Sequence, residues 1–161
     1  MVDTVMQRDQ GTYVEEQLLI MERNGYPEET YYTFSYSPVP DDDGAVGGII
    51  CANTDDTKRV IGERQLALLR ELAARTTDAR TWQEVCARGA EALATNPRDL
   101  PFALVYVFDP GGRALALVGT AGVARGHPAA PERVKTDEGP WPFAELRRAH
   151  GTVVVEDLTA L

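Results

Sequence analysis

The clearest pattern of hydrophobic and polar positions lies in "YYTFSYS", where aromatic and hydroxyl side chains alternate. Tyr32, Phe34 and Tyr36 occupy every second position, with Thr33 and Ser35 between them. Because successive side chains of an extended strand point to opposite faces, the three aromatic residues share one face. The pattern predicts a half-buried strand whose aromatic face is either core or the lining of a ligand pocket.

Two further runs surround this strand. The acidic stretch 41–44 ends in glycine and is followed by a run rich in Gly and Ile over residues 45–53. This order is typical of a hairpin turn and an antiparallel return strand. A shorter apolar run at residues 18–21 ends before Asn-Gly, a second turn signal. We therefore expect three consecutive antiparallel strands.

From about residue 57 the period changes to that of a helix, and Asp55 or Asp56 is placed to cap its start. Four positions with 4-3-4 spacing form a short heptad pattern, which we call the helix seam: Ile61, Gln65, Leu68 and Leu72. Leu66 and Leu69 widen the apolar stripe. A coiled coil normally requires about 3–4 heptads. The stripe therefore predicts either a helix packed on its own domain or the contact of a parallel helical dimer, and we favour the dimer.

The second half of the chain begins with a capping box, because Thr81 and Glu84 have the S/T-x-x-E spacing. One helix face is expected to be apolar, and it comprises Trp82, Val85, Cys86, Gly89 and Leu93. The following pattern predicts a strand (102–108), a turn, a return strand, a Gly/Pro-rich loop (119–140), a short helix (141–150) and a last strand (152–158).

Composition narrows the class of protein. The 161 residues include 25 acidic and 16 basic ones, for a net charge of -9. An acidic surface disfavours binding to nucleic acids and anionic membranes. We find no run approaching the ~20 apolar residues of a membrane span. The first residues lack the pattern of a secretion signal, so a cytoplasmic protein is expected.

The sequence contains no recognisable catalytic set. His127 and His150 lack the surroundings of a phosphoacceptor histidine, and no Gly-rich nucleotide-binding motif follows them. Cys51 and Cys86 give neither a disulfide framework nor metal-ligand spacing. We therefore predict no enzymatic activity, no cofactor and no metal in this chain.

The longer patterns resemble known sensory domains. "ERNGYPEETYYTFSYSPVPDDDGAVGGIICANTDDT" is similar to the last three strands of a bacterial PAS domain. "RVIGERQLALLRELAARTTDARTWQEVCARGAEAL" resembles a signalling helix that runs into a GAF domain. "NPRDLPFALVYVFDPGGRALALVGTAGV" and "WPFAELRRAHGTVVVEDL" resemble the first half of that domain. PAS followed by GAF in this arrangement is similar to the sensory region of bacterial histidine kinases.

The resemblance implies an α+β fold with three regions: a partial PAS-like domain (1–55), a connecting signalling helix (56–80) and a partial GAF-like domain (81–161). Each sensory part corresponds to half a domain, so we expect a fragment of a longer protein or a dimer formed by strand exchange.

The resemblance also implies a sensory module of a two-component system. It implies that Tyr32, Phe34 and Tyr36 line a pocket for an unidentified small ligand, and that the 119–140 loop covers a second one. The expected state is a homodimer that relays a signal to a kinase or phosphatase domain elsewhere. The alternative is a dimerising interaction module without a ligand.

Overall fold

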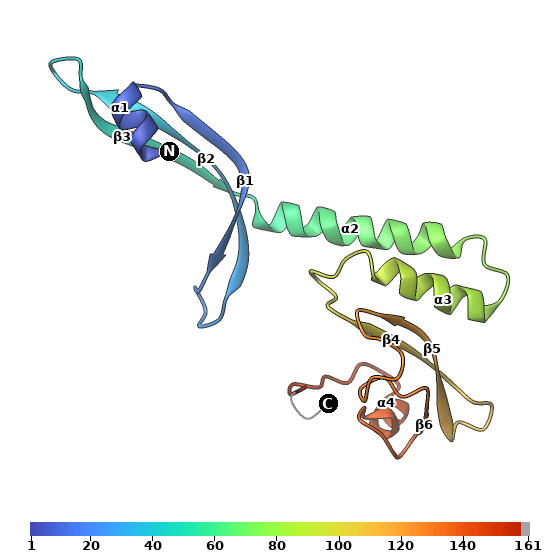
Figure 1. Ribbon diagram of the computed structural model, residues 1–161. Helices are drawn as coiled ribbons and strands as arrows, with labels where there is room; N and C mark the ends of the chain where they lie inside the picture. Colours follow the sequence, from blue (N-terminus) through green and yellow to red (C-terminus); the bar gives the residue numbers. More distant parts are fainter. Residues whose placement is uncertain (159–161) are drawn as a thin grey trace. The chain divides into compact units, whose positions relative to one another are not determined.

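The computed structural model describes residues 1–158 and divides into two compact units, Met1–Arg64 and Gln65–Leu161 (Figure 1). Each unit contains a three-stranded antiparallel sheet together with helices. The predicted α+β class is therefore confirmed. The boundary between the units falls within one helix, α2 (Thr57–Thr76).

The sheet of the first unit has the order β1-β2-β3, which confirms the three predicted antiparallel strands. A short helix packs against β2 and β3 (Figure 1). The elements of this unit, besides the start of α2, are α1 (Val2–Arg8), β1 (Thr12–Met21), β2 (Glu28–Pro40) and β3 (Val46–Asp55). Central strand β2 is the strand whose alternating aromatic pattern the sequence shows most clearly.

The β2–β3 turn is built by the side chain of Asp41. Its Oδ1 accepts hydrogen bonds from the backbone amides of Asp43 (3.0 Å) and Ala45 (2.8 Å). Gly44 has a φ of 82°, a conformation that glycine adopts at little cost. The predicted acidic turn is confirmed, and its D-x-x-G pattern recurs in the second unit.

The second unit repeats this hairpin chemistry. Asp109 Oδ1 accepts from the amides of Arg113 (2.8 Å) and Ala114 (3.2 Å), and Gly112 has a φ of 64°. The sheet has the order β4-β5-β6, and α3 packs against β5 and β4. The elements after α2 are α3 (Trp82–Leu93), β4 (Ala103–Phe108), β5 (Ala114–Ala121), β6 (Arg133–Lys135) and α4 (Phe143–Ala149).

A β-bulge allows strand β5 to contact two different neighbours. Val105 pairs with Gly119, whereas Tyr106 pairs with Leu117, so Val118 is the extra residue. Gly119 lies against α3, and a Cβ added there would be 2.6 Å from the Cβ of Ala90. In a regular strand, residues four positions apart lie on the same face, so Leu115 would share the face of Gly119. Leu115 instead packs with Phe143 in the main apolar cluster.

One boundary and one helix face differ from the sequence-based expectation. The connecting helix, expected over 56–80, ends at Thr76, where the hydroxyls of Thr76 and Thr77 bond back to the carbonyls of Leu72 and Ala73. On α3, Ala90 and Ala92 are buried while Trp82 and Val85 of the expected apolar face are exposed. Ala90 is buried because α3 approaches Gly119 of β5 closely, which leaves room for only a small side chain at that point.

The prediction of a strand over residues 152–158 is wrong. These residues belong to no helix or strand. Val153 and Val155 pair with no strand and instead line an apolar pocket together with residues of β4 and α4. The GAF-like region was expected to extend to residue 161, and its last three residues lie outside the described range.

None of the helices within residues 1–158 combines the length and the hydropathy needed to cross a bilayer.

Candidate ligand pocket and dimer seam

The aromatic face of β2 is half-buried, and its side chains interact with their neighbours. The rings of Phe34 and Tyr36 meet edge-to-face with their centroids 5.5 Å apart. The Tyr32 hydroxyl donates to Asp55 Oδ2 at 3.3 Å. The three pockets described for this chain are lined by residues of the second unit. A pocket at Tyr32, Phe34 and Tyr36 therefore stays a prediction.

The helix seam lies on a helix that has no buried residue over its 20 positions. Ile61, Leu68 and Leu72 are half-buried, and Gln65 is exposed. A Cβ added at Gly89 would lie 3.7 Å from Leu72 Cδ1, so Leu72 lies beside α3. The flanking Leu66 and Leu69 are 46% and 62% exposed. The helix thus carries an apolar stripe that its own chain covers only in part.

Two arginines attach the first turns of α2 to the sheet of the first unit. Arg59 Nη2 lies 2.7 Å from Glu16 Oε1, at the β1 bulge where Glu16 has a φ of 49°. Arg64 binds Glu29 on β2 with two bonds, at 2.7 and 3.2 Å. The Tyr31 hydroxyl donates to the same Glu29 carboxylate at 2.5 Å. Glu16 of β1 and Glu29 of β2 thus each bind an arginine of α2.

The start of α2 is capped as the sequence predicts. Asp55 Oδ1 accepts the Thr57 amide at 3.0 Å, and the Thr57 hydroxyl accepts the Tyr31 amide at 3.0 Å. The hydrogen bond from the Thr57 hydroxyl, followed by that from its amide, lowers the pKa of Asp55. A hydrogen bond from the Thr33 hydroxyl lowers the pKa of Asp56.

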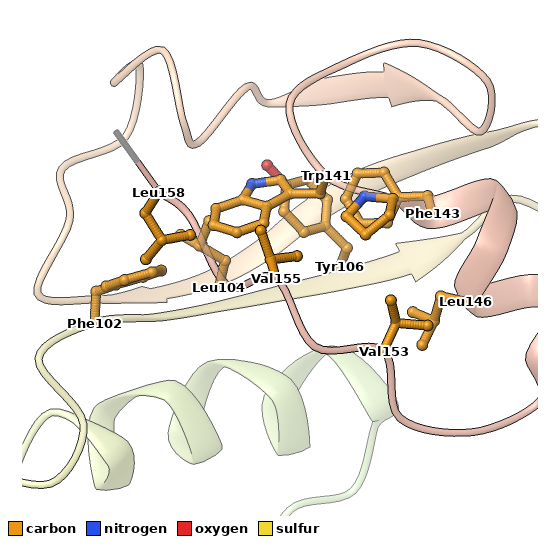
Figure 2. A pocket seen from close by; sticks show the side chains of 10 residues that line it. Phe102, Leu104, Tyr106, Trp141, Phe143, Leu146, Val153, Val155 and Leu158 are labelled. Atoms are coloured by element: carbon orange, nitrogen blue, oxygen red, sulfur yellow. The ribbon is translucent and has the colours of Figure 1, made fainter. Parts of the chain in front are cut away.

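The second unit contains an apolar pocket with a volume of about 410 Å³. Figure 2 shows β4 side chains on one side of the pocket and residues of α4 and the preceding turn on another. The lining residues are Phe102, Leu104, Tyr106, Trp141, Pro142, Phe143, Leu146, Val153, Val155 and Leu158. None of these ten side chains carries a charge.

The aromatic residues of the lining, which we call the aromatic wall, are Phe102, Tyr106, Trp141 and Phe143. The two polar groups of this wall already have hydrogen-bond partners. The Tyr106 hydroxyl donates to the carbonyl of Pro131 at 2.8 Å, and Trp141 Nε1–H donates to the carbonyl of Ala129 at 2.7 Å. Burial raises the pKa of Tyr106, so its hydroxyl stays neutral near pH 7. Ring contacts fix the wall further, with Tyr106 and Phe143 centroids 5.1 Å apart.

The chain segment 152–158, which we call the cover segment, contributes three lining side chains: Val153, Val155 and Leu158 (Figure 2). Val154, between them, is 76% exposed. No residue of 119–140 lines this pocket, and the stretch predicted as a loop contains the end of β5 and strand β6, so its role as a pocket cover stays a prediction. The loop supplies the carbonyls that hold the aromatic wall, and the lining residues come from the elements around it.

Sequence reasoning did not identify this pocket. The lining residues from β4 and the position just before it alternate as Phe102, Leu104 and Tyr106, which is the same two-residue period that drew attention to β2. The sequence predicts this run as a strand over 102–108. The pocket forms only when β4, α4 and the cover segment come together in the fold. The sequence predicts a strand for the cover segment and so does not indicate that its valines line a pocket.

The remaining candidate residues stay apart from this pocket. His127 Nδ1 accepts the Ala129 amide at 3.1 Å, and His150 ends α4 with a φ of 49°. Cys51 is exposed on β3, and Cys86 is half-buried on α3. Within residues 1–158, no three His, Cys, Asp or Glu side chains gather closely enough to hold a metal ion.

Comparison with known proteins adds no assignment, because no protein-family model and no curated protein matches this chain.

Proposed function

We propose that this chain is a cytoplasmic regulatory module of a bacterial signal-transduction protein. The first unit acts as a partial PAS-like sensory domain and the second as a partial GAF-like one. Helix α2 forms a homodimer and passes a conformational change to an output domain. Kinase or phosphatase activity belongs to that output domain, outside these residues.

One observation carries the proposal: helix α2 is tied to a sheet at its start and keeps apolar side chains exposed along its length. The ion pairs of Arg59 and Arg64 couple the helix to β1 and β2. The partly covered stripe around Leu68 and Leu69 gives the helix a surface that a second copy would bury. Attachment at one end and an apolar surface beyond it are what a relay helix needs.

The relay requires two helix arrangements that differ by a few kcal/mol. The seam has the polar Gln65 at one central position, and Gly62 lies one turn before it. A polar side chain in such a seam lowers dimer stability while it specifies register. Both residues therefore keep the two arrangements close in free energy.

The second candidate function is a dimerising interaction module without a ligand. The contacts of the β2 aromatic face favour it, because Phe34 packs on Tyr36 and the Tyr32 hydroxyl bonds to Asp55. These residues are then core, and α2 alone provides the activity. A retained small molecule in the purified protein separates the two candidates.

The test is the oligomeric state of the whole chain, measured by native mass spectrometry and sedimentation velocity. We expect a wild-type dimer and a monomeric Leu68→Asp variant, since a carboxylate in the seam loses hydration without a partner. Arg70→Asp introduces the same side chain on the same helix at an exposed position outside the seam and should leave the dimer intact.

Circular dichroism must show that both variants retain wild-type secondary structure. A dimer that persists in folded Leu68→Asp would rule out the seam and, with it, the relay. Native mass spectra also report added mass: a dimer with a bound small molecule supports the sensor, and a dimer without one supports the interaction module.

A further inference from the structure

We propose that the pocket of the second unit binds a small, uncharged, apolar ligand, and that the cover segment closes over it. The inference deepens the proposed sensory function, on which it rests for its biological meaning, by naming the site and the ligand class. The binding itself is a separate physical property of this unit.

Size is the first step of the argument. A volume of about 410 Å³ lies within the range of about 300–1,000 Å³ typical of small-molecule pockets. The space is therefore sufficient for a compact ligand of one to three rings or a short alkyl chain. It is too small for a folded partner.

The chemistry of the wall then selects the ligand. The lining has no charged side chain and no side-chain amide. Tyr106 and Trp141 use their polar hydrogens on the carbonyls of Pro131 and Ala129. A charged ligand would lose its hydration without gaining a partner from these side chains, whereas an apolar one gains from burial.

The wall is held in place without help from a ligand. Phe143 is 7% exposed and belongs to the main cluster with Leu115 and Val134. Trp141 packs against that cluster and is anchored through Nε1. Its ring lies 6.1 Å from that of Phe102 at the other end of the pocket. These contacts oppose collapse, so the pocket is preformed.

The cover segment provides a route of entry. It belongs to no helix or strand, so moving it breaks no helical or sheet ladder. Val153 and Val155 line the pocket, and Val155 is 37% exposed against 76% for Val154, so the segment turns its odd-numbered valines toward the pocket. Binding should therefore order residues 152–158.

The experiment uses two probes that differ by one charged group, N-phenyl-1-naphthylamine and its 8-sulfonate. Both become fluorescent in apolar surroundings. The protein is the full chain carrying Trp82→Phe, which leaves Trp141 as its tryptophan and as the energy donor to the bound probe. We expect saturable 1:1 binding of the neutral probe and at least about tenfold weaker binding of the sulfonate, a factor worth 1.4 kcal/mol.

A matched pair of variants locates the site. Val155→Asp places a carboxylate in the pocket and should weaken binding of the neutral probe at least about tenfold. Val154→Asp makes the same change at the exposed neighbour and should leave affinity within about twofold. Val155→Phe, which fills the pocket without adding charge or a second tryptophan, should also weaken binding, so the result does not depend on one variant folding.

Three results would overturn the inference: no saturable binding of the neutral probe to the folded chain, equal affinity for both probes, or equal effects of the Val154 and Val155 substitutions. The seam is tested separately by Leu68→Asp. Loss of probe binding with an intact seam rejects the ligand site and leaves the relay in place. Probe binding by a chain whose seam fails the Leu68→Asp test rejects the relay and leaves the ligand site in place.

Discussion

The two sheets of this protein share their strand order and turn chemistry, yet different forces hold them. Both are three-stranded and antiparallel, and both close a hairpin with D-x-x-G, at Asp41–Gly44 and at Asp109–Gly112. Hydrogen bonds and ion pairs attach the first sheet to the start of α2. The second packs against its helices through apolar side chains.

The first unit buries little apolar surface. Val5 and Tyr31 are its buried hydrophobic residues among those described. Thr30 is fully buried with them and donates to the carbonyl of Leu19 at 2.8 Å, as a buried hydroxyl must. The ion pairs that Arg59 and Arg64 form in the first unit are partly exposed, so each contributes modestly to stability.

The second unit has an apolar core of mixed sizes. Its buried hydrophobic residues are Ala90, Ala92, Leu115, Leu117, Ala121, Ala129, Ala130, Val134 and Phe143. Small residues permit close packing of α3 on β5, and the larger ones border the pocket. The comparison teaches that sheets of one pattern can be stabilised in two ways: chiefly by polar contacts with the start of α2 in the first unit, and by apolar packing beside a pocket in the second.

The largest expected effect is the loss of Phe143. Phe143→Ala removes the central ring of the apolar cluster and should cost the second unit about 3 kcal/mol, the low end for such changes because the ring borders an existing pocket. Val5→Ala in the first unit removes two methyl groups and should cost about 2 kcal/mol. Urea unfolding followed by hydrogen exchange measures the loss in each unit.

Tryptophan fluorescence reports on the second unit, because Trp82 and Trp141 both belong to it. Phe143→Ala should shift this signal, while exchange in β1–β3 changes less. Equal loss of protection in both sheets would contradict the difference in how they are held.

A glycine contact provides the next test. In Gly119→Ala the new Cβ would meet the Cβ of Ala90 at 2.6 Å and the carbonyl of Cys86 at 3.1 Å. Such overpacking should destabilise the second unit by about 1–3 kcal/mol. Gly62→Ala is the control, because nothing lies within 4 Å of that position and helix propensity should improve by up to about 1 kcal/mol. Thermal unfolding should move in opposite directions for the two variants.

Local patterns in the sequence predicted the hairpins and helices well. The D-x-x-G turns, the Thr81 cap and the alternation around Phe34 depend on neighbours within a few residues. Glu84 accepts the amide of Arg80 at 2.8 Å and donates its own amide to Thr81 Oγ1 at 3.2 Å, close to the expected capping box. Such signals are visible without knowledge of the fold.

The pocket and the bulge could not be predicted in the same way. The extra residue Val118 reverses which β5 side chains face α3, and no local pattern marks it. Val153 and Val155 alternate as a strand does, yet they pair with no strand and line a pocket with residues distant in the sequence, such as Leu104. The helix seam was predictable as a stripe, whereas the side contact of Leu72 with α3 was not.

The smallest expected effect concerns pH at the sheet–helix junction of the first unit. Thr57 lowers the pKa of Asp55 through its hydroxyl and amide, so this carboxylate stabilises the fold fully above its unfolded pKa of about 3.9. The contribution is lost as the pH falls through the lower pKa of the folded state. Asp109 behaves similarly in the second unit, where the amides of Ala114 and Arg113 lower its pKa.

Substitution at Thr57 separates the two carboxylates. Thr57→Val removes the hydroxyl, which should raise the pKa of folded Asp55 toward 3.9 and leave that of Asp109 unchanged. Carboxyl chemical shifts followed by NMR from pH 6 to pH 2 give both midpoints in one titration. An unchanged Asp55 midpoint would mean that the Thr57 hydroxyl does not stabilise this carboxylate. An upward shift confined to Asp55 would show that the Thr57 hydroxyl stabilises it locally, without an effect on the second unit.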